Sequence, residues 1–333
     1  MARAEALVRA ALPTPPVAPR GFAFGLELRA AEDREWAGAA TRANGGTRSV
    51  TMLVEDPGAF RARWRGTGSR ALAVRGGRPG RPMLRIEQED SGDYRVWAPG
   101  HGRHVIANDG TLIRSSVPRP PDDRWFRLFL AQPLPLAAAL HGLELFHASA
   151  VQVGEAVLGF VASSGTGKTS LAAQLVGRGA TFVTDDVLAL EVVDDVVVAH
   201  SGPRWLCLDE EEAHAMPPGG QGRLGPVIGK SDKLHFAPST SAAPAPVTTV
   251  FFLYRDHDVA SLEFREIDVL EPRRLFSSVF LSYLDEPRIL VRTLDFCARF
   301  ARLVRPIEVR VPPALGSGTL ADEVLGFTAR ELA

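Results

Sequence analysis

The first third of the chain is built from short apolar runs in which hydrophobic and polar residues alternate. Glycine, proline and Asp-Gly pairs separate these runs, and alternation with a period of two is typical of β-strands. Asn108-Asp109-Gly110 lies between two runs and predicts a tight hairpin turn. The pattern therefore predicts a β-rich region whose candidate strands lie at residues 21–28, 49–54, 71–74, 83–86, 94–97, 104–107 and 111–113.

Two flanking segments and one basic cluster complete this region. Residues 1–16 are interrupted by charges and prolines, which predicts a short helix before a proline linker and not a signal peptide. Residues 118–123 (PRPPDD) predict a linker, so we expect a β-rich accessory region at 1–120 and a second domain at 121–333. The basic cluster RARWR at 61–65 indicates a solvated strand or loop face, with a basic peptide-docking patch as the alternative.

After the linker, helical spacing alternates with apolar strands. Residues 125–140 carry apolar positions at helical spacing, and Pro133 and Pro135 predict that this helix breaks or restarts. Strands that alternate with helices are typical of an α/β domain. Further strands are predicted at 156–162, 180–184, 187–191, 196–200, 203–208, 247–254, 262–267 and 307–311, and further helices from 168, from 210, at 272–284, at 288–304 and, as a short one, in the tail.

The most informative stretch runs from Ala156 to Asp186. An apolar strand leads into a loop of serine, glycine and threonine, and a helix follows with Leu171 and Leu175 at helical spacing. Inward-pointing amides and a helix N-terminus suit a triphosphate, a lysine can reach its terminal phosphates, and a threonine hydroxyl can bind Mg²⁺. The consensus G-x-x-x-x-G-K-[ST] has glycine where this chain has Ala162. The predicted ATP-binding residues are Ser163, Ser164, Gly165, Thr166, Gly167, Lys168, Thr169 and Ser170.

Two adjacent carboxylates follow the next predicted strand. Asp185 and Asp186 lie 17 and 18 positions after Lys168. In a βαβ unit, such a strand end lies at the carboxyl edge of the sheet beside the phosphate loop, where open α/β sheets bind ligands. One carboxylate can bind Mg²⁺, and its neighbour can take the proton of an attacking hydroxyl. This placement favours phosphoryl transfer over a solvated turn, which is the alternative.

These motifs together resemble the catalytic core of the HPr kinase/phosphorylase family, which is itself similar to phosphoenolpyruvate carboxykinase in its phosphate-loop core. The resemblance rests on His147-Ala-Ser-Ala, on the loop S-S-G-T-G-K-T, on Arg178-Gly179 and on the Asp pair, in that order and spacing. It covers roughly residues 140–312. The segment 202–208 does not match the E-I-R-G-L-G type signature of the HPr kinases. The chain is more similar to the broader group of HPr-kinase-like proteins with an H-A-S motif, some of which phosphorylate precursor peptides of natural products.

The resemblance implies a fold and a division of roles. It implies an α/β fold with a P-loop core of the HPr kinase/phosphoenolpyruvate carboxykinase type, using ATP and Mg²⁺. It further implies Asp186 as general base toward a Ser or Thr hydroxyl, Asp185 and Thr169 at the metal, and His147 nearby. A lone histidine at a strand end is more commonly a structural hydrogen-bonding group, and the family spacing favours a place near the site.

Lysine is rare in this chain, which has 35 arginines and only Lys168, Lys230 and Lys233. A guanidinium fork does not replace a compact ammonium at a transferring phosphate, so the two later lysines become candidates for the same site. Lys233 is the stronger candidate, and Lys230 is equally well explained as a surface residue. Both follow the glycine-rich segment 217–226, which predicts a mobile element that closes over substrate, with a disordered crossing as the alternative.

Composition narrows the class of protein. The 38 basic and 39 acidic residues nearly cancel, and no basic run with interleaved aromatics points to nucleic acid. Cys207 and Cys297 have neither a disulfide pattern nor zinc-ligand spacing, which favours a reducing cytoplasm. No stretch has the length of a membrane span. The sequence leaves the oligomeric state open and allows a homo-oligomer.

The sequence therefore predicts an ATP- and Mg²⁺-dependent kinase. The expected acceptor is a Ser or Thr hydroxyl on a peptide or protein, such as a natural-product precursor peptide. Two alternatives stay open, namely a small-molecule kinase and a nucleotide-binding NTPase switch that transfers nothing to an acceptor. The Asp pair and His147 favour transfer chemistry.

Overall fold

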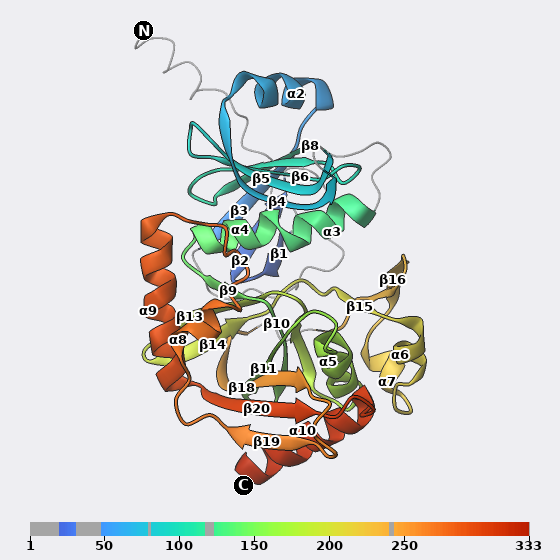
Figure 1. The fold of residues 1–333 in the computed structure, drawn as a ribbon. Coiled ribbons are helices and arrows are strands. Elements are labelled where there is room, and N and C mark those ends of the chain that lie inside the picture. Colours follow the sequence, from blue (N-terminus) through green and yellow to red (C-terminus); the bar gives the residue numbers. More distant parts are fainter. Residues whose placement is uncertain (1–19, 31–47, 79–80, 117–122, 240–242, 333) are drawn as a thin grey trace.

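The computed structural model describes residues 20–30, 48–78, 81–116, 123–239 and 243–332. The helix predicted within the first sixteen residues, and all but the last residue of the predicted linker, lie outside the described residues. Within the described part of the chain the strands form three sheets (Figure 1). None of the described helices combines the length and the apolar character that a membrane span needs.

The first sheet confirms the predicted β-rich region. Its strand order is β1-β2-β3-β8-β7-β6-β5-β4, in which β3 runs parallel to β2 and β8 and the other neighbours are antiparallel. The predicted Asn108-Asp109-Gly110 turn joins β7 to β8, with Gly110 at φ +75°. The strands are β1 Arg20–Ala23, β2 Leu26–Ala30, β3 Ser49–Val54, β4 Ser69–Arg78, β5 Arg81–Glu89, β6 Tyr94–Trp97, β7 Arg103–Ile106 and β8 Leu112–Ser116.

Two predictions for this region were wrong. The run at 21–28 is a hairpin and not one strand, because Phe24 and Gly25 adopt φ values of +53° and +74° and reverse the chain between β1 and β2. The basic cluster at 61–65 lies on helix α2 (Pro57–Gly66) and not on a strand or loop. Asp56 caps this helix by accepting hydrogen bonds from two backbone amides, and Pro57 is its first residue. These two helix-start signals were more informative about the structure than the charge of the cluster.

The first sheet packs on the helices α3 (Asp123–Ala131) and α4 (Pro133–Leu140), which break at Gln132 as the prolines predict. Phe129 and Leu134 are fully buried in the same hydrophobic core as Tyr94 from the sheet. This core continues to Val187 in the second sheet region. The first hydrophobic core therefore extends across residue 120, where the sequence predicted a domain boundary.

The second sheet confirms the strand–helix alternation predicted for the rest of the chain. Its order is β12-β10-β11-β18-β14-β13-β9, and β20 pairs with β18 and β19. The central neighbours β11, β18 and β20 are parallel, and β10 runs antiparallel between β11 and β12. The strands are β9 Glu144–Phe146, β10 Ala148–Val153, β11 Ala156–Ala162, β12 Thr181–Thr184, β13 Leu188–Val193, β14 Val196–His200, β18 Ala245–Arg255, β19 Glu263–Glu266 and β20 Arg305–Val311.

Helices cover both faces of the second sheet. Helices α5 (Lys168–Gly177) and α10 (Ser317–Leu332) share one hydrophobic core, and α8 (Pro272–Phe276) and α9 (Pro287–Leu303) share the other. The helix predicted at 272–284 ends at Phe276, because the chain then turns back and Val279 bridges to Phe146 of β9. The predicted short tail helix is the 16-residue α10, which is held by its apolar face on α5.

A third sheet of three strands lies to one side of α5 (Figure 1). Its order is β15-β17-β16, and β16 and β17 form a hairpin from the segment that contains Lys230 and Lys233. The segment 217–226, predicted as a loop, includes the short helix α7. The bounds are β15 Leu206–Leu208, α6 Glu210–His214, α7 Gly220–Arg223, β16 Val227–Lys230 and β17 Leu234–Phe236.

A partly buried ion cluster helps to join the first two sheets. Arg48, just before β3, donates to Glu191 of β13 at 2.6 Å, and His200 of β14 donates to the same carboxylate at 2.8 Å. The hydrogen bond from His200 and the charge of Arg48 outweigh the effect of burial and lower the pKa of Glu191 to about 2. The carboxylate therefore stays ionised between the sheets.

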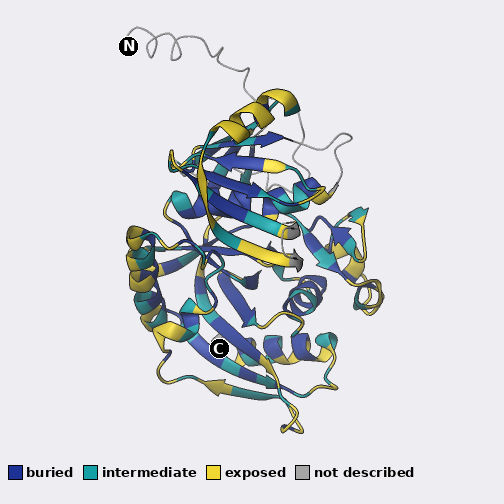
Figure 2. Cartoon of the chain, turned by 45° about the horizontal axis from the view of Figure 1, so that its top comes forward, coloured by how far each residue is buried: buried dark blue, intermediate teal, exposed yellow. Residues whose placement is uncertain are grey.

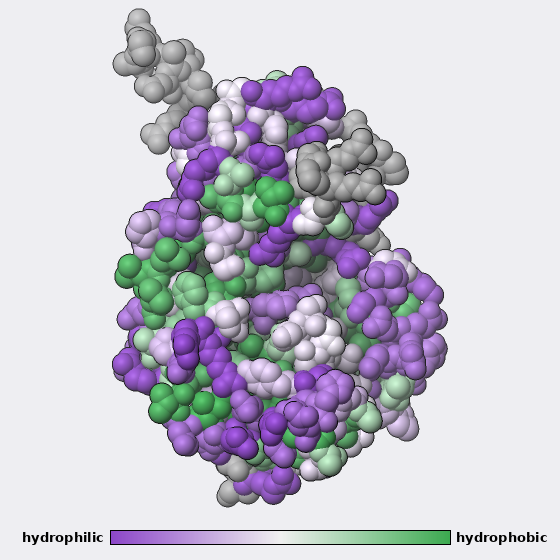
Figure 3. Space-filling view, in the orientation of Figure 1, coloured by the Kyte–Doolittle hydropathy of each residue, from purple (hydrophilic) through white to green (hydrophobic). Residues whose placement is uncertain are grey.

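Burial follows this layering. Buried residues line the strands of both large sheets, whereas α2 is largely exposed (Figure 2). Apolar atoms are exposed over α9 (Figure 3), where Val291 and Leu294 are 67% and 51% exposed. A homo-oligomer stays a prediction, because single exposed apolar residues are common on protein surfaces.

Candidate functional site

The predicted phosphate loop forms a strand–loop–helix unit. The buried strand β11 ends at Ala162, residues 163–167 form the loop, and α5 begins at Lys168. Gly165 and Gly167 have φ values of +79° and +106°, which favour glycine over residues with a side chain. No side chain caps α5 at Gly167. The first amides of the helix therefore face the loop without a side-chain acceptor.

Lys168 folds back across this loop. Its side chain is almost completely buried, and Nζ donates to the Ala162 carbonyl oxygen at 2.7 Å, at the end of β11. Burial lowers the pKa of Lys168, while the charges of Asp186 and Asp185 act in the opposite direction. The ammonium group and the two carboxylates therefore share one electrostatic environment.

Asp185 connects three separate elements. Its Oδ1 accepts a hydrogen bond from Thr169 Oγ1 at 2.9 Å, in the first turn of α5, and another from Ser149 Oγ at 2.7 Å, on β10. Burial and the adjacent charge of Asp186 raise the pKa of Asp185 to about 7, against the lowering effect of these hydrogen bonds. The carboxylate is thus held in place by two hydroxyl groups, while burial and the neighbouring charge disfavour its ionised form.

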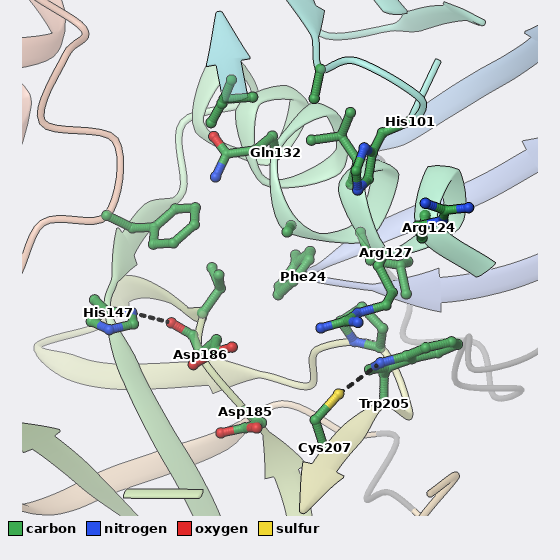
Figure 4. Close-up of a pocket in the computed structure, with 18 of the residues that line it drawn as sticks. Phe24, His101, Arg124, Arg127, Gln132, His147, Asp185, Asp186, Trp205 and Cys207 are labelled. Carbon is green, nitrogen blue, oxygen red and sulfur yellow. Dashed lines mark hydrogen bonds between the residues drawn. The ribbon is translucent and has the colours of Figure 1, made fainter. Parts of the chain in front are cut away.

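Asp186 occupies a strained turn. Its φ of +63° is rare for a residue with a side chain, and a Val187 N–H to Asp185 carbonyl hydrogen bond of 2.8 Å closes the turn. His147 Nδ1 donates to the backbone carbonyl of Asp186 at 3.0 Å (Figure 4). Non-glycine residues at such angles cost on the order of 1–3 kcal/mol and cluster at functional sites. The turn orients the exposed Asp186 carboxylate beside the better-buried Asp185.

A cavity of about 630 Å³ opens at this turn, where the three sheets meet. Asp185, Asp186, His147 and Ser164 line one end, which we call the carboxylate end. The opposite end, which we call the arginine end, lies below α3 (Figure 4). It contains Arg124, Arg127 and His101, and the walls between the two ends include Phe24, Leu84, Leu128, Trp205, Cys207 and Phe280.

The structure brings together most of the predicted site residues. Thr169 and Asp185 are in direct contact, Lys168 lies in the field of both aspartates, and His147 reaches the Asp186 backbone. Ser163, Gly165, Thr166, Gly167 and Ser170 lie in the loop or the first turn of α5, beside the cavity wall at Ser164.

Lys233 is not brought to this site. Its Nζ donates to Asp209 at 3.3 Å, Lys230 donates to Glu210 at 2.9 Å, and neither lysine lines the cavity. The reason is the β16–β17 hairpin, which directs both lysines toward the acidic start of α6. The scarcity of lysine therefore pointed to Lys168, which lies in the candidate site, but also to Lys230 and Lys233, which form surface ion pairs.

Three further residues were missed by the sequence reasoning. Ser149 lies inside the His147-Ala-Ser-Ala motif, so that motif could have indicated it. Arg255 ends β18, and its Nη2 lies 3.8 Å from where a Cβ on Gly167 would be. The parallel pairing of β18 with β11 would have indicated this residue. Arg127 reaches the cavity only because α3 packs under the first sheet, and no local signal points to it.

Comparisons with known proteins reveal distant resemblance to solved structures. No model of a protein family matches the chain, and no curated protein matches it. A solved structure, that of the Hpr(Ser) kinase/phosphatase from Coxiella burnetii, is 12% identical with a TM-score of 0.33. The match covers 57% of this chain and 99% of that chain. The described strands and helices themselves give a mixed α/β fold, and the match adds only a distant structural similarity to an HPr(Ser) kinase/phosphatase.

The raised pKa of Asp185 predicts a pH-dependent stability. The folded protein binds this proton more tightly than the unfolded chain, so stability falls as pH rises from about 3.8 to about 7. Asparagine keeps an oxygen acceptor without the charge. In EDTA, Asp185→Asn should match the wild-type melting temperature near pH 4 and exceed it by roughly 2 °C or more at pH 8.

The control for this measurement is Asp194→Asn, which removes a carboxylate from the exposed β13–β14 turn. It should give the same difference from wild type at both pH values. A difference for Asp185→Asn that does not change with pH would contradict the description of Asp185 as a carboxylate destabilised by its surroundings.

Proposed function

We propose that this chain is an ATP- and Mg²⁺-dependent kinase that transfers the terminal phosphate to a Ser or Thr hydroxyl of a peptide or protein. One observation carries the proposal. The Thr169–Asp185 hydrogen bond couples the start of α5 to the end of β12, directly beside a cavity that exposes Asp186. Thr169 and Asp185, which would bind the metal ion of the nucleotide, thus lie next to Asp186, which would face the acceptor. Transfer between two bound substrates requires this proximity.

The donor atoms suit Mg²⁺. Thr169 Oγ1 and Asp185 Oδ1 are hard oxygen ligands, and Ser149 holds the carboxylate from the other side. Mg²⁺ keeps several waters and takes few protein ligands when it binds with a nucleotide. This agrees with the described residues, among which no three His, Cys, Asp or Glu side chains form a metal-binding group. Bound Mg²⁺ would supply positive charge to the phosphates and to Asp185.

The loop suits the phosphates of ATP. A Cβ on Gly165 would meet no atom within 4 Å, so the space above this part of the loop is open. The uncapped N-terminus of α5 favours a negative charge, and Arg255 adds a guanidinium group on the β18 side. Lys168 can exchange its carbonyl partner for phosphate oxygens without leaving the loop.

Asp186 is the proposed general base. Its side chain is exposed in the cavity, whereas Asp185 is hydrogen-bonded to two hydroxyls. An acceptor hydroxyl placed against Asp186 would give its proton to the carboxylate as its oxygen attacks the terminal phosphate. His147 is a positioning residue in this scheme, because it binds the Asp186 backbone and not its side chain.

The cavity favours an acceptor over a nucleotide switch. A space of about 630 Å³ with mixed polar and apolar walls is in the size range of ligand sites. A small-molecule kinase stays the second candidate, because this volume also suits a small metabolite. Radiolabelled ATP incubated with a library of Ser/Thr peptides distinguishes the alternatives. We expect label in peptides, whereas release of free phosphate alone would favour the NTPase switch.

Lysine variants test the nucleotide site. Lys168→Ala removes the ammonium group at the phosphates, and turnover should fall by roughly 10²-fold or more while the fold survives. Lys233→Arg keeps an exposed ion pair with Asp209 and should stay within roughly two-fold of wild type. The measurements are steady-state phosphate transfer and circular dichroism. Full turnover in Lys168→Ala would rule out this loop as the nucleotide site.

Variants of the two aspartates separate metal binding from proton transfer. Asp186→Asn should bind Mg²⁺·ATP nearly normally and transfer phosphate about 10²- to 10⁴-fold more slowly. Asp185→Asn should instead raise the Mg²⁺ concentration needed for half-maximal rate. The rate is measured as a function of Mg²⁺ for both variants. The reverse pattern would exchange the two roles, and full activity in both would refute the mechanism.

A further inference from the structure

The arginine end of the cavity has no role in the phosphoryl transfer described above. Figure 4 shows the Arg127 side chain extending from α3 into the middle of the cavity, in the direction of Asp186. The two ends carry opposite charge, with Asp185 and Asp186 at one and Arg124 and Arg127 at the other. A ligand that spans them would meet a cationic group at one point and the proposed base at another.

Arg127 has only a weak protein partner. It is half-buried, and its Nη1 donates to Ser231 Oγ at 3.4 Å, at the tip of the β16–β17 hairpin. Among the described residues no carboxylate forms an ion pair with this guanidinium, and the nearby Asp232 carboxylate interacts with its charge without an ion-pair contact. Arginine side chains that are partly buried normally pair with an anion or several acceptors. The cavity therefore contains a cationic fork with most of its donors still available.

Gln132 supplies an independent second observation. Its side chain is 7% exposed and lines the cavity, and its buried Oε1 accepts no hydrogen bond from any described residue. It occupies the N-cap position of α4, yet its side chain makes no capping bond. An unpaired buried amide oxygen destabilises a protein, because it has lost its hydrogen bonds to water. This oxygen has almost no exposed surface, so a ligand with an N–H or O–H group would satisfy it once the side chain turns into the cavity.

Arg127 and Gln132 together indicate the chemistry of a ligand that would bind in this cavity. We propose that the acceptor is a peptide with an acidic group near its hydroxyl, whose carboxylate binds Arg127 and whose backbone N–H donates to Gln132. The proposal rests on the function proposed above and extends it to the class of substrate. Phe24, Trp205 and Phe280 line the walls and suit an apolar side chain of the same peptide. The carboxylate is either the chain terminus or a side chain of Glu or Asp.

Matched probes test this proposal by calorimetric titration of the full chain. N-acetyl-phenylalanine carries a terminal carboxylate, and its amide is the neutral match. Acetyl-Phe-Glu-amide carries a side-chain carboxylate, and acetyl-Phe-Gln-amide is its neutral match. At least one acid should bind about ten-fold or more tightly than its neutral match, because charge-assisted hydrogen bonds to arginine are strong. The acid that binds identifies the source of the carboxylate. Equal affinities, or no binding of any probe, would overturn the proposal.

Variants locate the binding to the arginine end. Arg127→Gln should abolish the preference for the acid, and Arg127→Lys should retain part of it, because lysine keeps the charge and loses the planar fork. Arg61→Gln on α2 is the matched control, since it removes one arginine charge outside the cavity, and it should keep the preference. A preference that survives in Arg127→Gln would contradict the assignment.

Gln132→Leu distinguishes a ligand-binding amide from a structural one. Removal of an unpaired buried oxygen should leave the melting temperature unchanged or higher, and probe affinity should fall by about five-fold or more. A lower melting temperature with unchanged affinity would show a structural amide and overturn its proposed role.

A separate titration of the wild type with Mg²⁺·ATP distinguishes a failure of this inference from a failure of the proposed function. Binding of Mg²⁺·ATP without any acid preference would refute the acidic acceptor alone, whereas an acid preference without Mg²⁺·ATP binding would refute the kinase alone.

Discussion

The hydrogen bond between Thr169 and Asp185 is the contact on which the candidate site depends. It joins the first turn of α5, the helix that follows β11, to the residue after β12, and β10 separates β11 from β12 in the sheet. Ser149 on that intervening strand donates to the same carboxylate oxygen, so the end of β12 is held from both sides. These two hydrogen bonds link the carboxylate group itself to the helix after the phosphate loop and to β10.

The same arrangement also lowers the stability of the folded protein. Asp185 is held in surroundings that raise its pKa to about 7, and Asp186 adopts a strained positive φ. Folded proteins retain such costs where a bound ion or substrate offsets them. A divalent cation at Thr169 and Asp185 would remove the electrostatic part of this cost. The strain at Asp186 aims a second carboxylate into the cavity, and the two features therefore support one chemical account.

The sequence could predict that the loop after β11 and the carboxylates after β12 lie together, because these residues lie close together in the chain and follow local rules. An apolar strand, a glycine-containing loop and a helix placed Lys168 and Thr169, and the next strand placed Asp185. The arginine end of the cavity could not be predicted this way. Arg127 and Gln132 reach the cavity through the packing of α3 and α4 on the first sheet, which depends on contacts between residues far apart in the chain.

Local sequence patterns also gave wrong predictions where a tertiary contact or a turn determines the structure. The basic cluster on α2 lacks strand alternation, and the Asp56–Pro57 helix start was the more informative signal. The helix after Pro272 is cut short by the bridge between Val279 and Phe146, which no local sequence feature announces. Lys233 stands beside Asp209 because a hairpin turned it there, so residue scarcity alone did not indicate function.

The most direct test is a crystal structure of the chain with Mg²⁺ and a non-hydrolysable ATP analogue. The account predicts that the phosphates contact the amides of residues 164–169 and that Mg²⁺ lies about 2.1 Å from Thr169 Oγ1, next to Asp185. It also predicts that the terminal phosphate faces the cavity at Asp186. A nucleotide bound elsewhere, or a metal ion with no link to Thr169 and Asp185, would contradict the account.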